Sequence, residues 1–173
     1  MTARRVLVLR HAKSDWSEPG LHDIDRPLSG RGRRAAAAMG VYMRDEGLAP
    51  DLVLCSAARR AVETWSTVAR VGEMAPRVME EPALYMAGAD ALFERVRAVD
   101  DAVTSVLLVG HAPGFDGFAC RLSGDRKSAD GRRMTEKFPT GALAVLELDV
   151  PSWRDLAEGI ARLERFIVPK DLL

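Results

Sequence analysis

The feature that most constrains the fold is a short apolar run, Val6-Leu7-Val8-Leu9, followed directly by Arg10-His11. Four apolar residues with no polar residue among them predict a strand buried on both faces, as in parallel sheets. Open parallel α/β sheets bind ligands just beyond the carboxyl ends of their strands. A guanidinium group fits phosphate, and a neutral imidazole is a nucleophile that works near neutral pH. The pair points to phosphoryl chemistry, although by itself it also fits an ordinary loop.

Similar patterns continue along the chain and alternate between strands and helices. Helical segments are expected from the N-cap Ser29 through 35–43, from the N-cap Ser56 to about residue 70, and at 89–99 and 115–122. Further strands are expected at 51–55, 77–79, 105–109, 142–148 and 162–168. This order predicts an α/β fold with a mostly parallel central sheet and helices on both faces. Residues 125–137 are charged and lack periodicity, which predicts a mobile surface loop, with a lid over the site as the alternative.

Length and charge limit the possible classes of protein. A chain of 173 residues fits one domain, 1–173, with room for a real core. Its net charge of zero gives no electrostatic case for nucleic-acid binding. The basic segment Met1–Arg5 is followed by only four apolar residues, too few for a signal peptide, and no run is long enough to span a membrane. We therefore expect a soluble, cytoplasmic protein that does not bind membranes.

Two other features have modest explanations. Cys55 and Cys120 are isolated and form no CxxC or Cys/His cluster, so we expect free thiols in a reducing compartment and no structural metal. Gly30, Gly32 and Ala35 mimic a dinucleotide-binding motif, but that motif must directly follow a strand and no strand precedes these residues. We expect the glycines to let the start of a helix pack closely.

Three predicted strand ends carry related side chains. The first is followed by Arg10 and His11, the second by Ser56, and the strand at 105–109 by Gly110-His111. In the helix that follows Ser56, Arg60 and Thr64 are four residues apart and share a face. Because the carboxyl ends of parallel strands share one edge of a sheet, two histidines and two arginines are expected to meet there.

These motifs resemble those of the histidine phosphatase superfamily. Its Arg-His-Gly is matched by Arg10-His11-Ala12, its Ser-Pro-x-x-Arg-Ala-x-x-Thr by Ser56 to Thr64 with Arg60 as the motif arginine, and its later Gly-His by Gly110-His111. Arg26-Pro27-Leu28 and Leu84-Tyr85-Met86 are similar to the SixA-type phosphohistidine phosphatase branch. Ala12 and Ala57 depart from the usual Gly and Pro, but neither change removes a reacting group. The resemblance implies a three-layer, phosphoglycerate mutase-like α/β fold.

The resemblance also implies a mechanism and a set of site residues. His11 would attack phosphorus and become a phosphohistidine, with its other ring nitrogen held by a backbone carbonyl. Arg10, Arg60 and His111 would surround the phosphoryl oxygens, and Lys13 and Ser56 would join them in binding substrate. Two guanidinium groups and an imidazole supply the positive charge, so no metal or cofactor is required.

The general acid and the substrate are less clearly indicated. Glu80, Glu81 and Asp90 are candidate acids, yet each also fits a solvated surface carboxylate. Phosphoramidates leave through a nitrogen that is easily protonated beforehand, so a site without a well-placed acid suits P–N bonds. The expected substrate is a phosphohistidine protein, for example a histidine phosphotransfer domain.

Three alternatives stay open at this stage. They are a small-molecule phosphomonoesterase, a phosphomutase of the same superfamily, and a non-catalytic phosphate-binding module. The sequence also leaves open whether the side chains of 13–16 contact the rim of the site or pack within their loop, and whether Thr140 touches the pocket or caps a turn.

Overall fold

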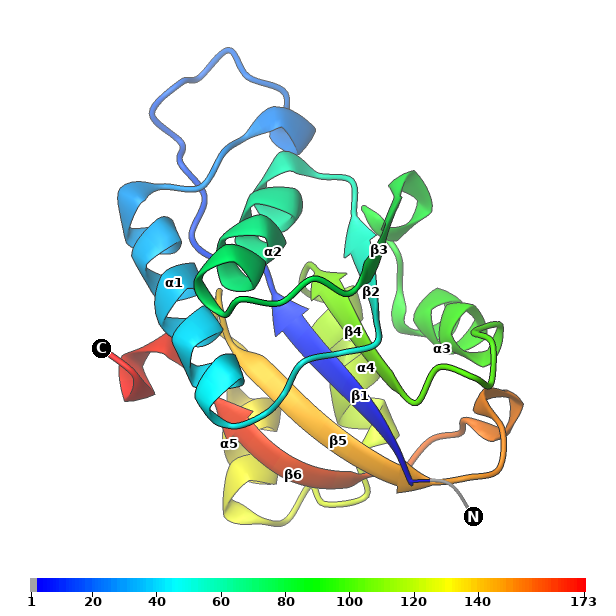
Figure 1. Ribbon diagram of the computed structural model, residues 1–173. Coiled ribbons are helices and arrows are strands. Elements are labelled where there is room, and N and C mark those ends of the chain that lie inside the picture. The colour runs from blue at the N-terminus through cyan, green and yellow to red at the C-terminus, as the bar shows by residue number, and fades with distance from the viewer. Residues whose placement is uncertain (1–2) are drawn as a thin grey trace.

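A computed structural model describes residues 3–173; Met1 and Thr2, part of the basic N-terminal segment considered above, lie outside the described residues. Its centre is a six-stranded sheet in the order β3-β2-β4-β1-β5-β6 (Figure 1). The strands are β1 (Ala3–Arg10), β2 (Leu52–Ser56), β3 (Arg77–Glu81), β4 (Ser105–Gly110), β5 (Leu143–Asp149) and β6 (Arg162–Ile167). Strands β1 to β4 pair in parallel, whereas β5 runs antiparallel to both β1 and β6. The predicted, mostly parallel sheet is confirmed.

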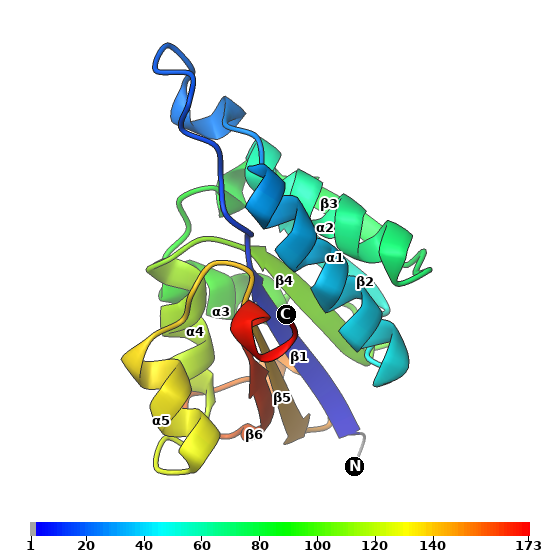
Figure 2. The ribbon, with the colours of Figure 1, turned by 90° about the vertical axis from the view of Figure 1, so that its left-hand side faces the viewer.

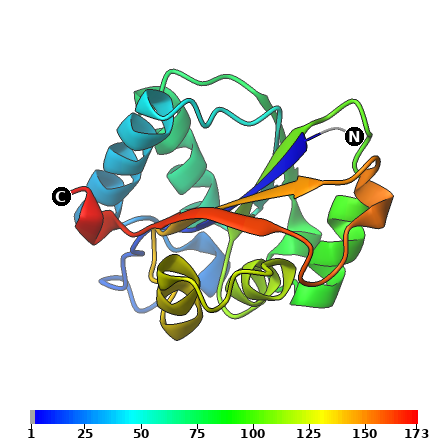
Figure 3. The same ribbon diagram turned by 90° about the horizontal axis from the view of Figure 1, so that it is seen from below.

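Helices cover both faces of this sheet, as expected. On one side lie α1 (Gly30–Asp45) and α2 (Arg59–Val71), and on the other α3 (Ala89–Arg97), α4 (Gly114–Leu122) and α5 (Ala129–Glu136) (Figure 3). Figure 3 shows the sheet nearly edge-on between the two helical layers. The predicted three-layer α/β architecture is therefore confirmed.

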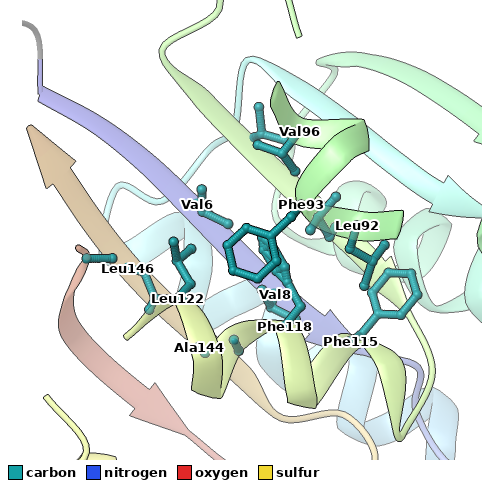
Figure 4. Packing of buried hydrophobic residues seen from close by; sticks show 14 of the residues in the cluster. Val6, Val8, Leu92, Phe93, Val96, Phe115, Phe118, Leu122, Ala144 and Leu146 are labelled. Carbon is teal, nitrogen blue, oxygen red and sulfur yellow. The ribbon is translucent and has the colours of Figure 1, made fainter. Parts of the chain in front are cut away.

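The two sides of β1 explain why its apolar run does not alternate. Val6 and Val8 point toward the α3 and α4 side, where they pack with the rings of Phe93 and Phe118 (Figure 4). Leu7 and its neighbour Leu9 belong to the opposite cluster, together with apolar residues of α1 and α2. All four side chains are fully buried, so a polar residue at any of these positions would lose its water without a ready partner.

The start of α1 follows the sequence closely. The Oγ of Ser29 accepts a hydrogen bond from the backbone N–H of Gly32 at 3.0 Å, which makes Ser29 the predicted N-cap. A Cβ on Gly32 would lie 2.1 Å from the carbonyl oxygen of Lys13, so this glycine does allow close packing. Gly30 has no such constraint, because its nearest neighbour is the end of a flexible Arg34 side chain.

Ser56 was expected to cap α2, and this prediction is wrong. Ser56 is the last residue of β2, and α2 begins at Arg59 after Ala58, which offers no side-chain cap. The Oγ of Ser56 accepts from the N–H of Ala58 at 3.2 Å, but Ala58 itself precedes the helix, so this bond does not cap α2. The chain bends at residues 57–58, and the Ser56 hydroxyl contacts His111.

The prediction of a mobile loop at 125–137 is also wrong, since α5 occupies most of that segment. The Oγ of Ser128 caps the helix by accepting from the N–H of Gly131 at 3.0 Å. Met134 is the buried apolar residue of this helix, and Phe138 packs into the core just after it. A single apolar anchor in a short helix leaves almost no periodicity for sequence analysis to detect.

The remaining sequence expectations concern cysteines and membranes. Cys55 and Cys120 are both free, and burial raises the pKa of the Cys55 thiol to about 12. A thiol with so high a pKa stays protonated and is a poor nucleophile at neutral pH. Within residues 3–173, every helix is too short or too polar to cross a lipid bilayer.

Candidate active site

The two predicted histidines meet at the carboxyl edge of the sheet. Arg10 and Gly110 are register partners in the neighbouring strands β1 and β4, so the residues that follow them emerge side by side. The ring centroids of His11 and His111 lie 5.3 Å apart. The prediction that these two residues gather at one strand edge is confirmed.

A hydrogen bond fixes the orientation of the His11 ring. Its Nδ1 lies 2.7 Å from the backbone oxygen of Ala12. Because a carbonyl can only accept, Nδ1 carries the hydrogen and Nε2 keeps a free lone pair. The contact matches the backbone acceptor that the sequence analysis expected.

The backbone around His11 is itself anchored by the second motif. The N–H of Ala12 donates to the Oγ1 of Thr64 at 2.9 Å, and that hydroxyl donates to the carbonyl of Arg60 at 2.6 Å. From the other side, the N–H of Gly141 donates to the carbonyl oxygens of both Arg10 and His11. Thr64 therefore links two motifs that lie far apart in the sequence.

Both imidazoles are neutral at neutral pH. Burial lowers the pKa of His11 to about 4; the hydrogen bond to Ala12 raises this pKa in part, and the nearby charges of Arg60 and Arg10 lower it. Burial also lowers the pKa of His111 to about 3, again with help from neighbouring positive charge. A neutral His11 can attack an electrophile without first losing a proton.

Ser56 holds the second histidine. Its Oγ lies 2.7 Å from Nε2 of His111 and already accepts from the N–H of Ala58. The hydroxyl proton of Ser56 is thus available to donate to Nε2, which would leave the hydrogen of this ring on Nδ1. Among the described residues, the buried Nδ1 of His111 has no hydrogen-bond partner.

Arg60 forms an ion pair with Asp23 at the site. Its Nη1 donates to the backbone oxygen of Asp23 at 2.7 Å, and its Nη2 donates to Oδ2 of the same residue at 3.0 Å. The hydroxyl of Tyr85 donates to that Oδ2 as well, and the ring of Tyr85 stands edge-on to His111 with centroids 5.5 Å apart. The hydrogen bond from Tyr85 lowers the pKa of Asp23 below its usual value, so this carboxyl is ionised at neutral pH.

Sequence reasoning missed the roles of Asp23 and Tyr85. Asp23 lies three residues before the Arg26-Pro27-Leu28 motif, and Tyr85 is inside the Leu84-Tyr85-Met86 motif, so a signal was present but no contact could be assigned. Asp23 begins the short 3-10 segment Asp23–Asp25, and Tyr85 directly follows the 3-10 segment Pro82–Leu84.

Arg10 lies at the edge of the site. Its side chain is half-buried, and Nη1 donates to the carbonyl of Phe138 at 2.8 Å. Burial lowers the pKa of Arg10, and the charge of Asp116, in the first turn of α4, offsets only part of this change. Burial raises the pKa of Asp116 itself, and its Oδ1 is buried without a hydrogen-bond partner among the described residues. Nothing in the sequence distinguishes Asp116 from other helical carboxylates.

The structure places none of the three candidate acids beside the histidines. Both oxygens of Glu81 accept from Arg95, at 2.8 and 2.7 Å. Asp90 forms an ion pair with Arg121 at 2.9 Å, and its side chain is 89% exposed. Glu80 is exposed on the edge strand β3.

A groove of about 820 Å³ adjoins the site, and we call it the basic groove. It contains Arg10 and the predicted substrate-binding residue Lys13, together with Thr140, so Thr140 lines this adjoining groove. The complete lining is Arg10, Lys13, Arg31, Ala35, Arg133, Glu136, Lys137, Pro139, Thr140, Phe166, Val168, Pro169, Lys170 and Leu173. Arg10 is the residue that the basic groove shares with the histidine site.

The other residues of the loop after β1 pack within it. The indole N–H of Trp16 donates to the Oγ of Ser14 at 2.9 Å, and the guanidinium of Arg26 lies 3.8 Å from the centre of the Trp16 ring. The carboxylate of Asp15 accepts from the N–H of Ser17 at 2.8 Å. These three side chains therefore organise the loop.

Comparisons with known proteins agree with this geometry. Residues 6–84 match the family model described as the histidine phosphatase superfamily, branch 1. An uncharacterised protein of Mycobacterium tuberculosis is 40% identical over 164 residues, which cover 94% of this chain and all of that protein. The solved structure of a candidate phosphohistidine phosphatase SixA from Nakamurella multipartitia has a TM-score of 0.85 and 32% identity, with 98% of each chain covered. The structure of a candidate SixA from Agrobacterium tumefaciens has a TM-score of 0.78 and 28% identity, with 98% of this chain and 100% of that chain covered.

Fold, site and comparisons together define a phosphatase of the α/β class. The chain belongs to the histidine phosphatase superfamily, and within it to the SixA-type branch. In residues 3–173, no cluster of three or more His, Cys, Asp or Glu side chains is arranged to hold a metal ion.

Proposed function

We propose that this protein removes phosphoryl groups from phosphohistidine proteins through a phosphohistidine intermediate on His11. The observation that carries the proposal is the paired, neutral His11 and His111, with the lone pair of His11 Nε2 free and two guanidinium groups close by. The names of the SixA relatives support the same substrate class.

The reaction has two steps. In the first, Nε2 of His11 forms a bond to phosphorus while the P–N bond of the substrate breaks. The electron pair returns to the substrate nitrogen, and because the other nitrogen of that imidazole already carries a proton, the ring leaves neutral. In the second step, water bonds to phosphorus, the P–N bond to His11 breaks, and inorganic phosphate is released.

Charge on the phosphoryl oxygens is stabilised by three groups in this proposal. Arg10 and Arg60 provide guanidinium donors, and His111 provides the hydrogen on Nδ1, which has no other partner. Ser56 acts as a positioning residue because it holds Nε2 of the same ring. Each donor of this kind is worth about 3–4 kcal/mol in the transition state. The proposed reaction requires no metal and no cofactor.

The carboxylates favour a P–N substrate. A phosphate ester leaves as an alkoxide and needs a proton donor, whereas a phosphohistidine does not. Asp23, the carboxyl that touches Arg60, is held ionised and cannot donate, and the three candidate acids lie elsewhere. The proposed substrate is therefore a phosphohistidine protein, such as a cytoplasmic histidine phosphotransfer domain.

One observation favours a second candidate function. The raised pKa of Asp116 keeps more of this carboxyl protonated, which would suit a small-molecule phosphomonoesterase. Hydrolysis of phosphate monoesters that is much faster than that of phosphohistidine, and that is lost in Asp116→Asn, would establish this alternative.

The test compares turnover of a phosphohistidine peptide with that of a phosphate monoester. We expect the phosphohistidine peptide to have the higher kcat/KM, and we expect rapid quench to trap an acid-labile, base-stable phosphoryl label on the protein. Transfer of phosphate between sugars instead of its release would indicate a mutase. A single burst of product without turnover would indicate a binding module, and either result would overturn the proposal.

A further inference from the structure

The basic groove has a composition that the rest of the molecule does not share. The chain has a net charge of zero and only four lysines among its 25 basic residues. Three of those four lysines, Lys13, Lys137 and Lys170, line this one groove together with three arginines. Glu136 is the acidic side chain in the lining. Such clustering in an otherwise balanced chain creates a local positive field.

Most of these cations form no ion pair with the part of the chain that the structure describes. Arg133 is neutralised by Asp130 and Asp171, at 3.1 and 2.8 Å. No ion pair among residues 3–173 involves Lys13, Arg31, Lys137 or Lys170, although fifteen ion pairs form between other residues. These side chains are exposed and free to contact an anionic ligand.

Tertiary structure joins the groove to the histidine site. Its walls come from the start of α1, the end of α5 and the 3-10 turn Pro169–Asp171, which lies between those two helices in Figure 2. The segment between α5 and β5 connects the wall to the site, since Phe138 accepts from Arg10 and Gly141 donates to the carbonyl oxygens of Arg10 and His11. A ligand with its phosphoryl group at His11 can therefore extend past Arg10 into the groove.

The size and lining of the groove favour a peptide. About 820 Å³ falls near the upper end of ordinary ligand pockets, which is far more than one phosphoryl group fills. Flexible lysines act as adaptable point charges, suited to a chain of carboxylates rather than to one rigid anion. Apolar residues such as Pro139, Val168 and Leu173 also line the groove and can pack against a peptide backbone.

A nucleic acid fits less well. Single strands bind in basic grooves that also present exposed aromatic rings for base stacking. The aromatic residue of this lining, Phe166, is only 2% exposed and packs against the ring of Phe138.

We propose that the basic groove binds an acidic segment of the phosphoprotein substrate, next to the residue that carries the phosphoryl group. This inference rests on the proposed function for its substrate class, but the groove itself can be tested without catalysis. Binding in the groove would make the choice of substrate depend on Asp and Glu residues that flank the phosphorylated site.

The experiment uses the full chain, a double variant Lys137→Glu/Lys170→Glu and a matched control Lys127→Glu, which reverses the one lysine outside the groove. Fluorescence anisotropy measures binding of an unphosphorylated acidic peptide and of a neutral peptide in which Gln and Asn replace Glu and Asp. In parallel, kcat/KM is measured for phosphohistidine peptides with acidic or neutral flanks and for phosphoramidate. Thermal unfolding confirms that all variants fold.

We expect the acidic peptide to bind at least tenfold more tightly than the neutral one, and to lose that advantage in the double variant but not in Lys127→Glu. The ratio of kcat/KM for the acidic phosphopeptide to that for phosphoramidate should fall about tenfold in the double variant alone. Equal binding of both peptides, equal losses in the control, or displacement of the acidic peptide by a tighter-binding oligonucleotide would overturn the inference.

The two proposals can fail separately. Tight binding of the acidic peptide with no hydrolysis of any phosphohistidine substrate would overturn the proposed function and leave the groove in place. Efficient hydrolysis at a rate that does not depend on the flanking residues would overturn the inference about the groove, and the proposed function would stand.

Discussion

The histidine site and the basic groove share Arg10, yet they use positive charge in opposite ways. In the histidine site, His11 and His111 are under a tenth exposed, and each hydrogen bond of their rings goes to a fixed neighbour. In the groove, the lysines are exposed and form no ion pairs among the described residues. Buried, oriented groups stabilise one transition state strongly, whereas exposed charges are screened by water and salt and adapt to many ligands. In our two proposals, the histidine site performs the chemistry and the basic groove selects the partner.

Replacing the nucleophile should have the largest effect. We expect His11→Ala to lower kcat by about 10⁴–10⁶-fold, as loss of a catalytic nucleophile does elsewhere, and to abolish the phosphoryl label on the protein. The matched control is His22→Ala, because His22 is exposed and outside the pair. Persistence of an acid-labile label in His11→Ala would mean that another residue is the nucleophile.

The two adjacent arginines of α2 test whether burial or charge alone matters. Arg60 is under a tenth exposed and bound to Asp23, whereas Arg59 is exposed and pairs with Glu63 at 2.8 Å. We expect Arg60→Ala to lower kcat/KM by about 10²–10³-fold and Arg59→Ala to change it less than about threefold. Similar losses in both variants would show that the site responds to overall charge, which would remove the contrast with the groove.

Acid should destabilise the protein through the buried histidine. The pKa of His11 is about 4 in the folded state, below its ordinary value of 6.5, so between these values the unfolded chain binds a proton that the folded chain does not. The free energy of unfolding is therefore highest above pH 6.5. It falls by about 3 kcal/mol as the pH falls toward 4, because of this one residue.

Urea unfolding at several pH values measures this effect. His11→Ala should show a flatter dependence of the unfolding free energy on pH than the unmodified protein, with His22→Ala as the control. Ring resonances of His11 that titrate near pH 6.5 in NMR spectra would contradict the assigned burial.

A change in salt concentration should have the smallest effect, and it should weaken binding in the basic groove more than catalysis at the histidine site. Raising the ionic strength from about 0.05 to 0.3 M shortens the Debye length below the dimensions of the groove. We expect kcat/KM for an acidic phosphopeptide to fall several-fold, and that for phosphoramidate to fall by less than about twofold. Equal salt sensitivity for the two substrates would indicate that the groove does not contribute to recognition.

Much of the sheet and the histidine pair could be predicted from the sequence. Val6 to Leu9 are buried on both faces of the sheet, so all four consecutive residues must be apolar and the strand is visible in the sequence. Once parallel strands are predicted, the meeting of His11 with His111 follows from the common direction of their strand ends. The Ser29 cap and the close packing of Gly32 were equally accessible, because each depends on a local backbone requirement.

Other features depend on contacts between distant and mostly polar residues. Asp23 and Tyr85 come together 62 positions apart, and Ser56 turns toward a histidine 55 positions away instead of capping the next helix. Helix α5 is stabilised by the burial of Met134 rather than by periodicity, so a local pattern predicted a loop. None of these residues differs in type from ordinary surface or loop residues.

The sequence alone determined the chemistry that we propose, because apolar runs fix the strands and the strands fix where Arg10, His11 and His111 emerge. Only the tertiary structure decided that Lys13, Lys137 and Lys170 share one groove. Burial demands apolar residues and so leaves a record at each position, whereas an exposed lysine is tolerated almost anywhere on a surface and acquires meaning only from its neighbours in space.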